Sequence, residues 1–569
     1  ERSFHFGSAE HHVCGMISHL GPQLAIADGV ALAHKLKKES KISLAFTGDG
    51  GTSEGDFHEA LNVAAVWDLP VIFIIENNGY GLSTPTSEQY RCKNLVDKAI
   101  GYGIEGVRID GNNILEVYET IKGVREYCIN NQKPYLIECM TFRMRGHEEA
   151  SGVKYVPKHL FEEWELKDPI KNYESWLRKE NILSEGEITE MRLTIKNHIE
   201  EELKIGFESG PLIPNTDEEC YDVYAPRLHA PSLLIDNSKE EDFNNNNASS
   251  EKKYINAISD ALEQSLKRYD GFVLMGQDIA EYGGAFKVTE GFTEKFGKER
   301  IRNTPICESA IVGASLGLSL AGMKSMMEMQ FADFVTVGFN QIVNNLAKIH
   351  YRWGQNADVV VRMPTGGGVG AGPFHSQSNE AWFVHTPGLK VVYPSSPIDA
   401  KGLLIAAIND PNPVIFFEHK GLYRSISGMV PDDYYEIEIG KAKHVKTGSD
   451  ISIITYGMGV HWALDYQKQH PSVSVDILDL RTLLPLDYDA IRSAVMRTGK
   501  VLLLHEDTMI GGIGGEISAW ITENCFRHLD APIIRCASLD TPIPFNIDLE
   551  KNFMAKTRLA EAVERLMAY

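Results

Sequence analysis

The stretch GDGGTSEGD at residues 48–56 decides how the first part of this chain folds. A predicted strand at residues 41–46 precedes it, and a predicted helix at residues 53–67 follows it. Glycine lets the backbone approach a ligand closely, and the free N–H groups at the start of a helix attract an anion such as a diphosphate. The stretch therefore predicts an anion-binding turn between a strand and a helix.

A second polar loop follows the next predicted strand. Residues 70–76 read PVIFIIE, as in a buried strand, and residues 77–80 read NNGY. This order is typical of a doubly wound parallel sheet, whose strands end at one edge, so we expect Asp49 and Asn78 to converge. One carboxylate and one amide oxygen suffice for Mg²⁺ when phosphates and water complete its shell. Two ordinary turns are the alternative, and they would need both loops to arise by coincidence.

Length and residue pattern predict several domains. At 569 residues the chain exceeds the roughly 250–300 residues of a single hydrophobic core. A second strand and helix alternation begins near residue 254, a third begins at residue 450, and the Asn run at residues 244–247 indicates an exposed linker. We expect α/β domains at residues 1–210, 254–430 and 431–569, with a linker at 211–253.

Composition excludes several classes of function. The formal net charge of -22 repels nucleic acid, which is bound largely through Lys and Arg. No apolar run approaches the roughly 20 residues that cross a membrane, and no signal peptide is visible. The eight cysteines are scattered without a C-x-x-C pair, which favours metal-free thiols in a reducing compartment. We expect a cytoplasmic protein that binds neither membrane nor nucleic acid.

With both loops accepted, the chain resembles the decarboxylating component of pyruvate and branched-chain 2-oxo acid dehydrogenase complexes, with its two subunits fused. The resemblance implies two doubly wound domains that bind thiamine diphosphate and a smaller transketolase-like C-terminal α/β domain. It gives the diphosphate and Mg²⁺ to the first domain and the pyrimidine to the second. The implied metal ligands are Asp49, Asn78 and Tyr80. The implied cofactor contacts in the first domain are Ser18, Leu20, Gly48, Asp49, Gly50, Gly51, Asn78 and Tyr80.

The second domain contains the stretch NTPICE at residues 303–308. By resemblance, Glu308 hydrogen-bonds the pyrimidine ring and promotes the imino tautomer that takes the thiazolium proton. A carboxyl group in an apolar surround can share a proton at neutral pH. Composition alone favours an ordinary acid at a helix start, and the resemblance reverses that preference.

Residues 329–334 read MQFADF and resemble the family segment that flanks the pyrimidine. In that segment a Gln and an aromatic ring lie beside the pyrimidine, and here they are Gln330 and Phe334. Relatives commonly carry Tyr at the position of Phe334, so stacking survives but a hydroxyl hydrogen bond does not. An aromatic residue that merely fills the core is the alternative for Phe334.

Two histidines follow from the same comparison. Residues 374–378 read FHSQS and residues 143–147 read RMRGH, which resemble the two histidine loops of the family. By resemblance, His375 and His147 steady the substrate carboxylate and donate protons during acyl transfer. Histidine suits this role because its pKa lies near neutrality. Neighbouring glycines predict that both histidines lie on loops.

The resemblance implies oxidative decarboxylation of a 2-oxo acid, with the acyl group passed to a lipoyl-lysine of a separate dihydrolipoyl acyltransferase. Residues 276–286, 329–334 and 351–354 look more like branched-chain than pyruvate members, so 2-oxoisovalerate is favoured and pyruvate stays open. A transketolase-like enzyme, such as a deoxyxylulose-phosphate synthase, is disfavoured by the two histidine loops. A scaffold without catalysis is disfavoured because the expected catalytic residues all remain.

The resemblance also implies an assembly and some departures. A fused chain is expected to form a homodimer. Relatives carry more of the first domain before residues 5–8, so we expect this domain to be incomplete at its N-terminus. Residues 148–151 read EEAS where mammalian members carry a phosphorylatable serine, so kinase control at that position is not expected.

Overall fold

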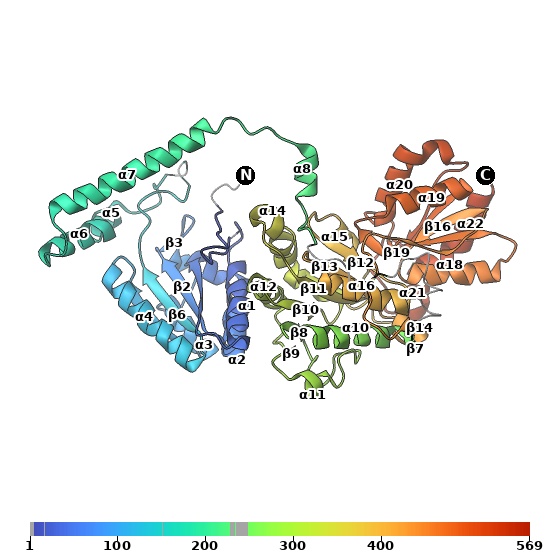
Figure 1. Cartoon of the computed structure of the whole chain (residues 1–569), viewed down its shortest axis with the longest axis horizontal. Helices are drawn as coiled ribbons and strands as arrows, with labels where there is room; N and C mark the ends of the chain where they lie inside the picture. Colours follow the sequence, from blue (N-terminus) through green and yellow to red (C-terminus); the bar gives the residue numbers. More distant parts are fainter. Residues whose placement is uncertain (1–4, 16, 149, 151, 228–233, 235–247) are drawn as a thin grey trace. The chain divides into compact units, whose positions relative to one another are not determined.

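The computed structural model describes residues 5–15, 17–148, 150, 152–227, 234 and 248–569 (Figure 1). Residues 228–233 and 235–247 of the expected linker, and Glu149 and Ser151 of the EEAS stretch, lie outside these residues. The chain forms two compact units, one of residues 19–222 and one of residues 1–18 with 223–569. Among the described residues, no helix has the length and apolar character needed to cross a membrane.

The smaller unit is built on a four-stranded parallel sheet in the order β1-β2-β6-β5. Every residue of β2 except Glu76 is buried, as expected for a strand covered on both faces. The strands are β1 (Ser43–Gly48), β2 (Val71–Asn77), β5 (Glu105–Asp110) and β6 (Tyr135–Met140). The helices beside the sheet are α1 (Pro22–Leu36), α2 (Gly55–Trp67), α3 (Lys98–Tyr102) and α4 (Ile114–Asn131). The predicted strand, turn and helix are confirmed, with boundaries shifted by one or two residues.

A helical tail completes this unit and confirms the expected helices up to about residue 210. It contains α5 (Lys158–Glu165), α6 (Pro169–Lys179) and α7 (Glu185–Glu208), which stands apart from the sheet in Figure 1. A further short helix, α8 (Thr216–Tyr221), lies within the expected linker. It forms because the Asn215 side chain accepts hydrogen bonds from the backbone N–H groups of Asp217 and Glu218.

The larger unit contains a seven-stranded sheet in the order β18-β12-β13-β11-β10-β8-β9. All neighbours are parallel except β12 and β18. The strands are β8 (Phe272–Gly276), β9 (Ile301–Asn303), β10 (Lys324–Glu328), β11 (Val359–Thr365), β12 (Lys390–Val392), β13 (Val414–His419) and β18 (Thr482–Leu484). The helices are α10 (Tyr254–Arg268), α11 (Phe292–Phe296), α12 (Glu308–Leu320), α13 (Val335–Asn340), α14 (Ile349–Trp353), α15 (Ala381–Val384), α16 (Pro397–Asn409) and α17 (Leu422–Ser425).

The helical stripe expected after residue 254 is the buried face of α10, which packs against α16 in the main core of this unit. The expected end of the linker differs. Residues 249–253 form strand β7 (Ser249–Lys253), which pairs antiparallel with β14 (Ser427–Pro431). This antiparallel pair satisfies backbone groups of β7, so residues 249–253 of the expected linker belong to a sheet.

The C-terminal region has its own five-stranded sheet in the order β15-β17-β16-β19-β20. Its strands are β15 (Lys443–Lys446), β16 (Ile451–Thr455), β17 (Val475–Asp479), β19 (Val501–Thr508) and β20 (Ile534–Ser538). Its helices are α18 (Met458–Gln469), α19 (Tyr488–Thr498), α20 (Ile513–Cys525), α21 (Ile547–Phe553) and α22 (Leu559–Met567). The predicted third alternation is confirmed, including the helix after the GGIGG turn. Between β17 and α19, strand β18 leaves this sheet and joins the seven-stranded one.

A buried ion network ties three adjacent strands of the seven-stranded sheet. Arg362 on β11 donates to both carboxylate oxygens of Glu418 on β13, each at 2.6 Å, and to Glu328 on β10 at 2.6 Å. The side chain of Arg362 is fully buried, and the hydroxyl of Tyr423 donates to Glu418 at 2.7 Å. The network fixes the carboxyl ends of β10, β11 and β13 relative to one another.

Removing Arg362 should therefore destabilise this unit. In Arg362→Met the two buried carboxylates lose their cation, and we expect a loss of about 3–5 kcal/mol of stability. Urea denaturation followed by tryptophan fluorescence measures it. The exposed Arg565→Met is the matched control and should stay within about 0.5 kcal/mol of the wild type. Equal stability of the two variants would contradict the assigned role.

Candidate active site

Asp49 lies immediately after β1 at the carboxyl edge of the smaller sheet and is 2% exposed. Its Oδ1 accepts a hydrogen bond from the backbone N–H of Gly50 at 2.7 Å, while its buried Oδ2 has no hydrogen-bond partner among the described residues. Burial raises the pKa of Asp49, and backbone N–H groups, that of Gly50 first, partly offset this rise. A Cβ atom on Gly50 would lie 3.0 Å from the Cα of Gly81, so the loops after β1 and β2 lie side by side, as predicted.

The loop after β2 is held in a tight turn by its own amide side chains. Asn78 Oδ1 accepts from the backbone N–H of Tyr80 at 3.0 Å, and Asn77 Oδ1 accepts from that of Gly79 at 3.1 Å. Asn77 also donates to the buried Glu138 at 2.7 Å. An amide oxygen has a second lone pair, so Asn78 keeps the capacity to bind a cation.

The glycines of the first turn are required by close packing. A Cβ atom on Gly51 would lie 2.3 Å from Thr47 Oγ1, and one on Gly50 would lie 3.0 Å from the Cα of Gly81. Lys98 Nζ donates to the backbone oxygen of Thr52 at 2.7 Å and fixes the turn from the side. Gly48 has no such restriction, since a Cβ there would meet nothing within 4 Å.

This arrangement fits a hard cation with a bound diphosphate. The unpartnered Asp49 oxygen and the amide oxygens nearby are the ligand types that Mg²⁺ prefers. No three His, Cys, Asp or Glu side chains converge as a metal cluster in the described part of the chain. The expected ligand set contains only one carboxylate and does not need such a cluster.

The two earliest predicted cofactor contacts differ in their surroundings. Leu20 lies beside the glycine turn, because its Cβ would be 3.7 Å from a Cβ on Gly51. Ser18 hydrogen-bonds the Nε2 of His5 at 2.8 Å and belongs to the larger unit. Only Leu20 is thus linked to the turn by a contact within its own unit.

His147 is linked to the Asn78 loop through Arg143. Arg143 donates to the backbone oxygen of Leu82 at 2.7 Å, and its Nη1 lies 3.2 Å from His147 Nδ1. Tyr80 meets Tyr155 edge-on at 5.7 Å, and the hydroxyl of Tyr155 accepts from Arg143 at 3.3 Å. The RMRGH loop is therefore fastened onto the loop that follows β2. Sequence reasoning missed this use of Arg143, although the arginine belongs to the quoted motif.

In the larger unit, Glu308 is the first residue of α12 and is 6% exposed. A Cβ on Gly338 of α13 would lie 3.2 Å from the backbone oxygen of Glu308. Four residues separate Glu308 from the end of β9 at Asn303, so the acid lies near the carboxyl edge of the seven-stranded sheet. Both the helix-start position and the burial agree with the sequence analysis.

The MQFADF and FHSQS segments meet in space. His375 contacts Phe331 and Phe334 edge-on, with ring centroids 4.9 and 5.5 Å away. Gln330 donates to Asp278, in the loop after β8, at 3.3 Å. Phe334 is only half-buried, which differs from an aromatic residue that merely fills the core. The structure thus brings Phe334 and His375 into contact, as residues of one site require.

The FHSQS loop also donates hydrogen bonds to a carboxylate. Asp333 Oδ1 accepts from the backbone N–H of Gln377 at 3.2 Å and from its Nε2 at 3.0 Å. Both His375 and His147 lie outside helices and strands, which confirms that prediction.

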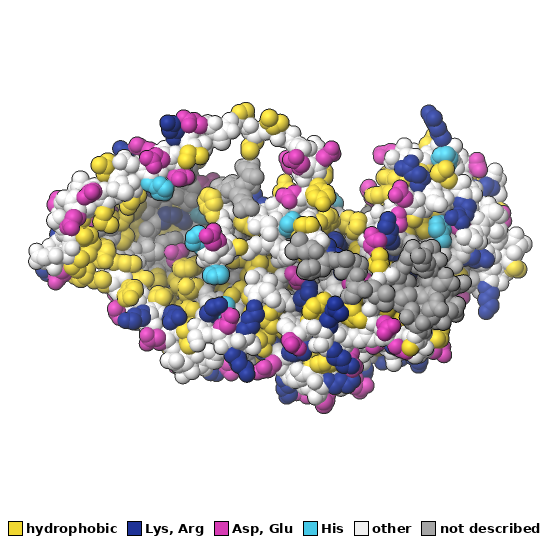
Figure 2. Space-filling model, in the orientation of Figure 1, with side chains coloured by type: hydrophobic (Ala, Val, Ile, Leu, Met, Phe, Trp, Pro, Cys, Tyr) yellow, Lys and Arg dark blue, Asp and Glu magenta, His cyan; other side chains and the backbone are white. Residues whose placement is uncertain are grey.

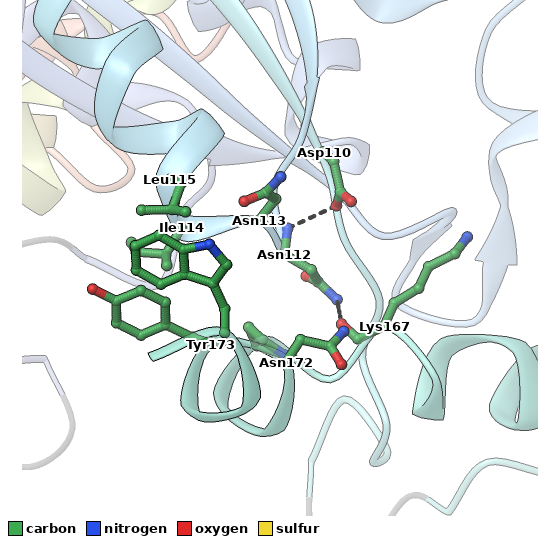
Figure 3. Close-up of a pocket in the computed structure, with 10 residues that line it drawn as sticks. Asp110, Asn112, Asn113, Ile114, Leu115, Lys167, Asn172 and Tyr173 are labelled. Atoms are coloured by element: carbon green, nitrogen blue, oxygen red, sulfur yellow. Dashed lines mark hydrogen bonds between the residues drawn. The ribbon is translucent and has the colours of Figure 1, made fainter. Parts of the chain in front are cut away.

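A pocket of 310 Å³ lies away from the predicted residues, at the edge strand β5 of the smaller unit (Figure 3). Asn112, Lys167, Tyr173 and Trp176 are among its lining residues, and Asn112 donates to the backbone oxygen of Lys167 at 3.0 Å. None of the residues predicted for the site lines this pocket.

On the face drawn in Figure 2, basic and acidic side chains are interspersed, unlike the continuous basic surface that binds nucleic acid.

Comparison with known proteins covers almost the whole chain. The family model described as the dehydrogenase E1 component matches residues 1–212. The models of the transketolase pyrimidine-binding domain and the transketolase C-terminal domain match residues 250–425 and 440–558. The order of the three matches follows the three α/β regions of the fold.

Individual relatives each match a little more than half of the chain. The 2-oxoisovalerate dehydrogenase subunit beta of Bacillus subtilis is 47% identical over 320 residues, which cover 55% of this chain and 98% of that protein. The mitochondrial 2-oxoisovalerate dehydrogenase subunit beta of Dictyostelium discoideum is 40% identical over 354 residues, or 60% of this chain and 91% of that protein. The pyruvate dehydrogenase E1 component subunit beta of Bacillus subtilis is 42% identical over 296 residues, covering 51% and 91%.

Asp49→Asn tests the cation site directly. The amide keeps the shape of the side chain but removes the negative charge that faces the cation. We expect the Kd of thiamine diphosphate in the presence of Mg²⁺ to rise at least about tenfold, measured by isothermal titration calorimetry. Glu54→Gln, an exposed acid in the same motif, is the control and should bind as the wild type does. An unchanged Kd in Asp49→Asn would exclude this carboxylate as a ligand.

Proposed function

Since this chain belongs to the E1 component family of 2-oxo acid dehydrogenases, with the regions of both subunits joined in one polypeptide, we propose that it decarboxylates branched-chain 2-oxo acids such as 2-oxoisovalerate. Members of this family are thiamine-diphosphate-dependent enzymes, so this chain is one of them. An E1 component works with an acyltransferase partner. Between the two Bacillus subtilis relatives, identity is higher to the 2-oxoisovalerate dehydrogenase subunit, 47%, than to the pyruvate dehydrogenase subunit, 42%, and this difference supports the branched-chain assignment.

The chemistry divides between the cofactor and the residues described above. Bound thiamine diphosphate supplies the carbanion and the electron sink for loss of CO₂. Asp49, Asn78 and Tyr80 would hold Mg²⁺ and the diphosphate, and the glycine turn and the helix start would favour the anion. The buried, unpartnered oxygen of Asp49 is the single observation that carries this half of the proposal.

The larger unit would bind the pyrimidine of thiamine diphosphate. Glu308 would hold a proton for the pyrimidine ring, in a buried position where a carboxyl group can share a proton. Gln330 and Phe334 would flank the ring. His375 would steady the substrate carboxylate and donate a proton as the acyl group passes to the lipoyl-lysine of a dihydrolipoyl acyltransferase, and the family resemblance gives His147 the same kind of role.

The substrate assignment is tested by an artificial-acceptor decarboxylation assay with added Mg²⁺ and thiamine diphosphate. We expect kcat/KM for 2-oxoisovalerate to exceed that for pyruvate by about tenfold or more, because a few methylene groups in an apolar pocket discriminate by about 1–3 kcal/mol each. A preference for pyruvate would replace the branched-chain assignment. Turnover of sugar phosphates without an acyltransferase would overturn the proposed reaction.

Glu308→Gln tests the proton-sharing role. The amide cannot exchange the proton, so the artificial-acceptor rate should fall by about 10²–10⁴-fold while the Kd of thiamine diphosphate changes little. Glu294→Gln, an exposed acid on α11, should keep the wild-type rate. A Glu308→Gln rate close to that of the control would remove Glu308 from the mechanism.

The assembly is tested by mass photometry. We propose that the fused chain forms a homodimer, because one chain contains the regions of both subunits. An active monomer would contradict this.

A further inference from the structure

A glycine-rich loop, residues 366–372, leads from the end of β11 to His375. Its sequence is GGGVGAG, and Gly366, Gly368, Gly370 and Gly372 all have positive φ. At Gly366 this is also a packing requirement, since a Cβ there would lie 2.2 Å from His419 Nε2. Such a loop has little intrinsic preference for one conformation, so its shape must come from the groups around it.

Two carboxylates of the C-terminal region bind the backbone of this loop. Glu550 on α21 accepts from the N–H groups of Gly368 and Gly370, both at 2.9 Å and each at a different oxygen. Glu506 on β19 accepts from the N–H of Gly367 at 2.6 Å. Both acids are buried, at 1% and 5% exposed. Hydrogen bonds from backbone N–H groups to a carboxylate are stronger than neutral ones, so these acids hold the loop firmly.

Lys420 closes the loop from the other side. Its Nζ donates to the backbone oxygen of Gly366 at 2.7 Å and to that of His375 at 2.8 Å, which joins the start of the loop to the histidine. Burial lowers the pKa of Lys420 to about 8. The cation therefore lies at the base of the loop, opposite the two carboxylates.

Glu506 is kept in its charged form by His419. His419 Nδ1 accepts from the backbone N–H of Gly421 at 3.0 Å, so its Nε2 carries the hydrogen that Glu506 accepts at 2.7 Å. Burial raises the pKa of Glu506, but His419, the N–H of Gly367 and Lys420 together outweigh burial and hold that pKa below its usual value. Glu506 thus stays ionised near neutral pH and continues to accept the hydrogen bond from the N–H of Gly367.

We propose that Glu550, supported by Glu506, is a positioning residue that sets the place of His375 through the loop at 366–372. Among the described residues, the hydrogen bonds of Glu550 go to the backbone of Gly368 and Gly370, so its effect on the histidine passes through the loop. The C-terminal region therefore takes part in arranging the imidazole as well as in packing. The inference rests on the proposed role of His375 in acyl transfer.

Glu550→Gln is the principal test. The amide replaces one acceptor oxygen by an N–H donor, which then faces a backbone N–H of the loop. We expect acyl transfer to the lipoyl acceptor in the full-length enzyme to fall about 10–100-fold, because small misplacements of a catalytic group cost this much. Glu550→Asp keeps the charge but is one methylene shorter, so it should be intermediate. Glu561→Gln, an exposed acid on α22, should transfer within about twofold of the wild type.

Two further measurements separate positioning from general damage. Hydrogen exchange read by mass spectrometry should accelerate at least about tenfold in a peptide covering residues 366–375, with no change in the peptides of β16 and β19. In a double-mutant cycle, Glu550→Gln should cost little more in a His375→Ala background, because the group that it positions is already gone.

Several results would overturn the inference. Wild-type transfer or wild-type exchange of the loop peptide in Glu550→Gln would do so, as would full additivity with His375→Ala. His375→Ala with wild-type transfer would remove the proposed role of His375 and, with it, the need for positioning. Impaired His375→Ala together with unimpaired Glu550→Gln would overturn the positioning role alone.

Discussion

The buried fork between Arg362 and the carboxylates of Glu418 and Glu328 is the interaction on which the catalytic side of the larger unit depends. It locks three parallel strands at their carboxyl ends, and the functional segments leave the sheet from those ends. Gln330 follows β10, the glycine-rich loop follows β11, and Lys420 follows β13. A shift of one strand against the next would displace all three segments at once.

In the smaller unit, too, parallel strands place functional loops at one edge of the sheet. The adjacent parallel strands β1 and β2 end in register, with Gly48 opposite Glu76. The loops that follow them are therefore neighbours. Asp49 then accepts a hydrogen bond from the N–H of Gly50 with one oxygen, while its other, buried oxygen has no partner in the part of the chain that the structure describes. A buried polar atom without a partner costs stability, and retention of that cost is typical of a site prepared for a ligand.

Much of this could be predicted from the sequence because it follows from local pattern and parallel topology. The convergence of Asp49 and Asn78 needs only two strands and their order, and the loop positions of His147 and His375 need only neighbouring glycines. The assignment of Phe334 and His375 to one site came from resemblance, and their contact is a finding of the structure. No local pattern predicts Glu550 as a partner of Gly368, because 182 residues separate them and a single glutamate carries no periodic signal. The strand β7 was likewise missed, since its hydrogen-bond partner β14 lies far along the chain.

Strand β18 has a consequence for any attempt to dissect the protein. It belongs by sequence to the C-terminal region, yet it forms the margin of the seven-stranded sheet beside β12. A truncation near residue 440 would uncover the backbone groups of β12 and offer them as a template to other chains, so the isolated fragment would tend to aggregate. The last two regions are therefore interlocked, and they should be expressed and engineered as one piece.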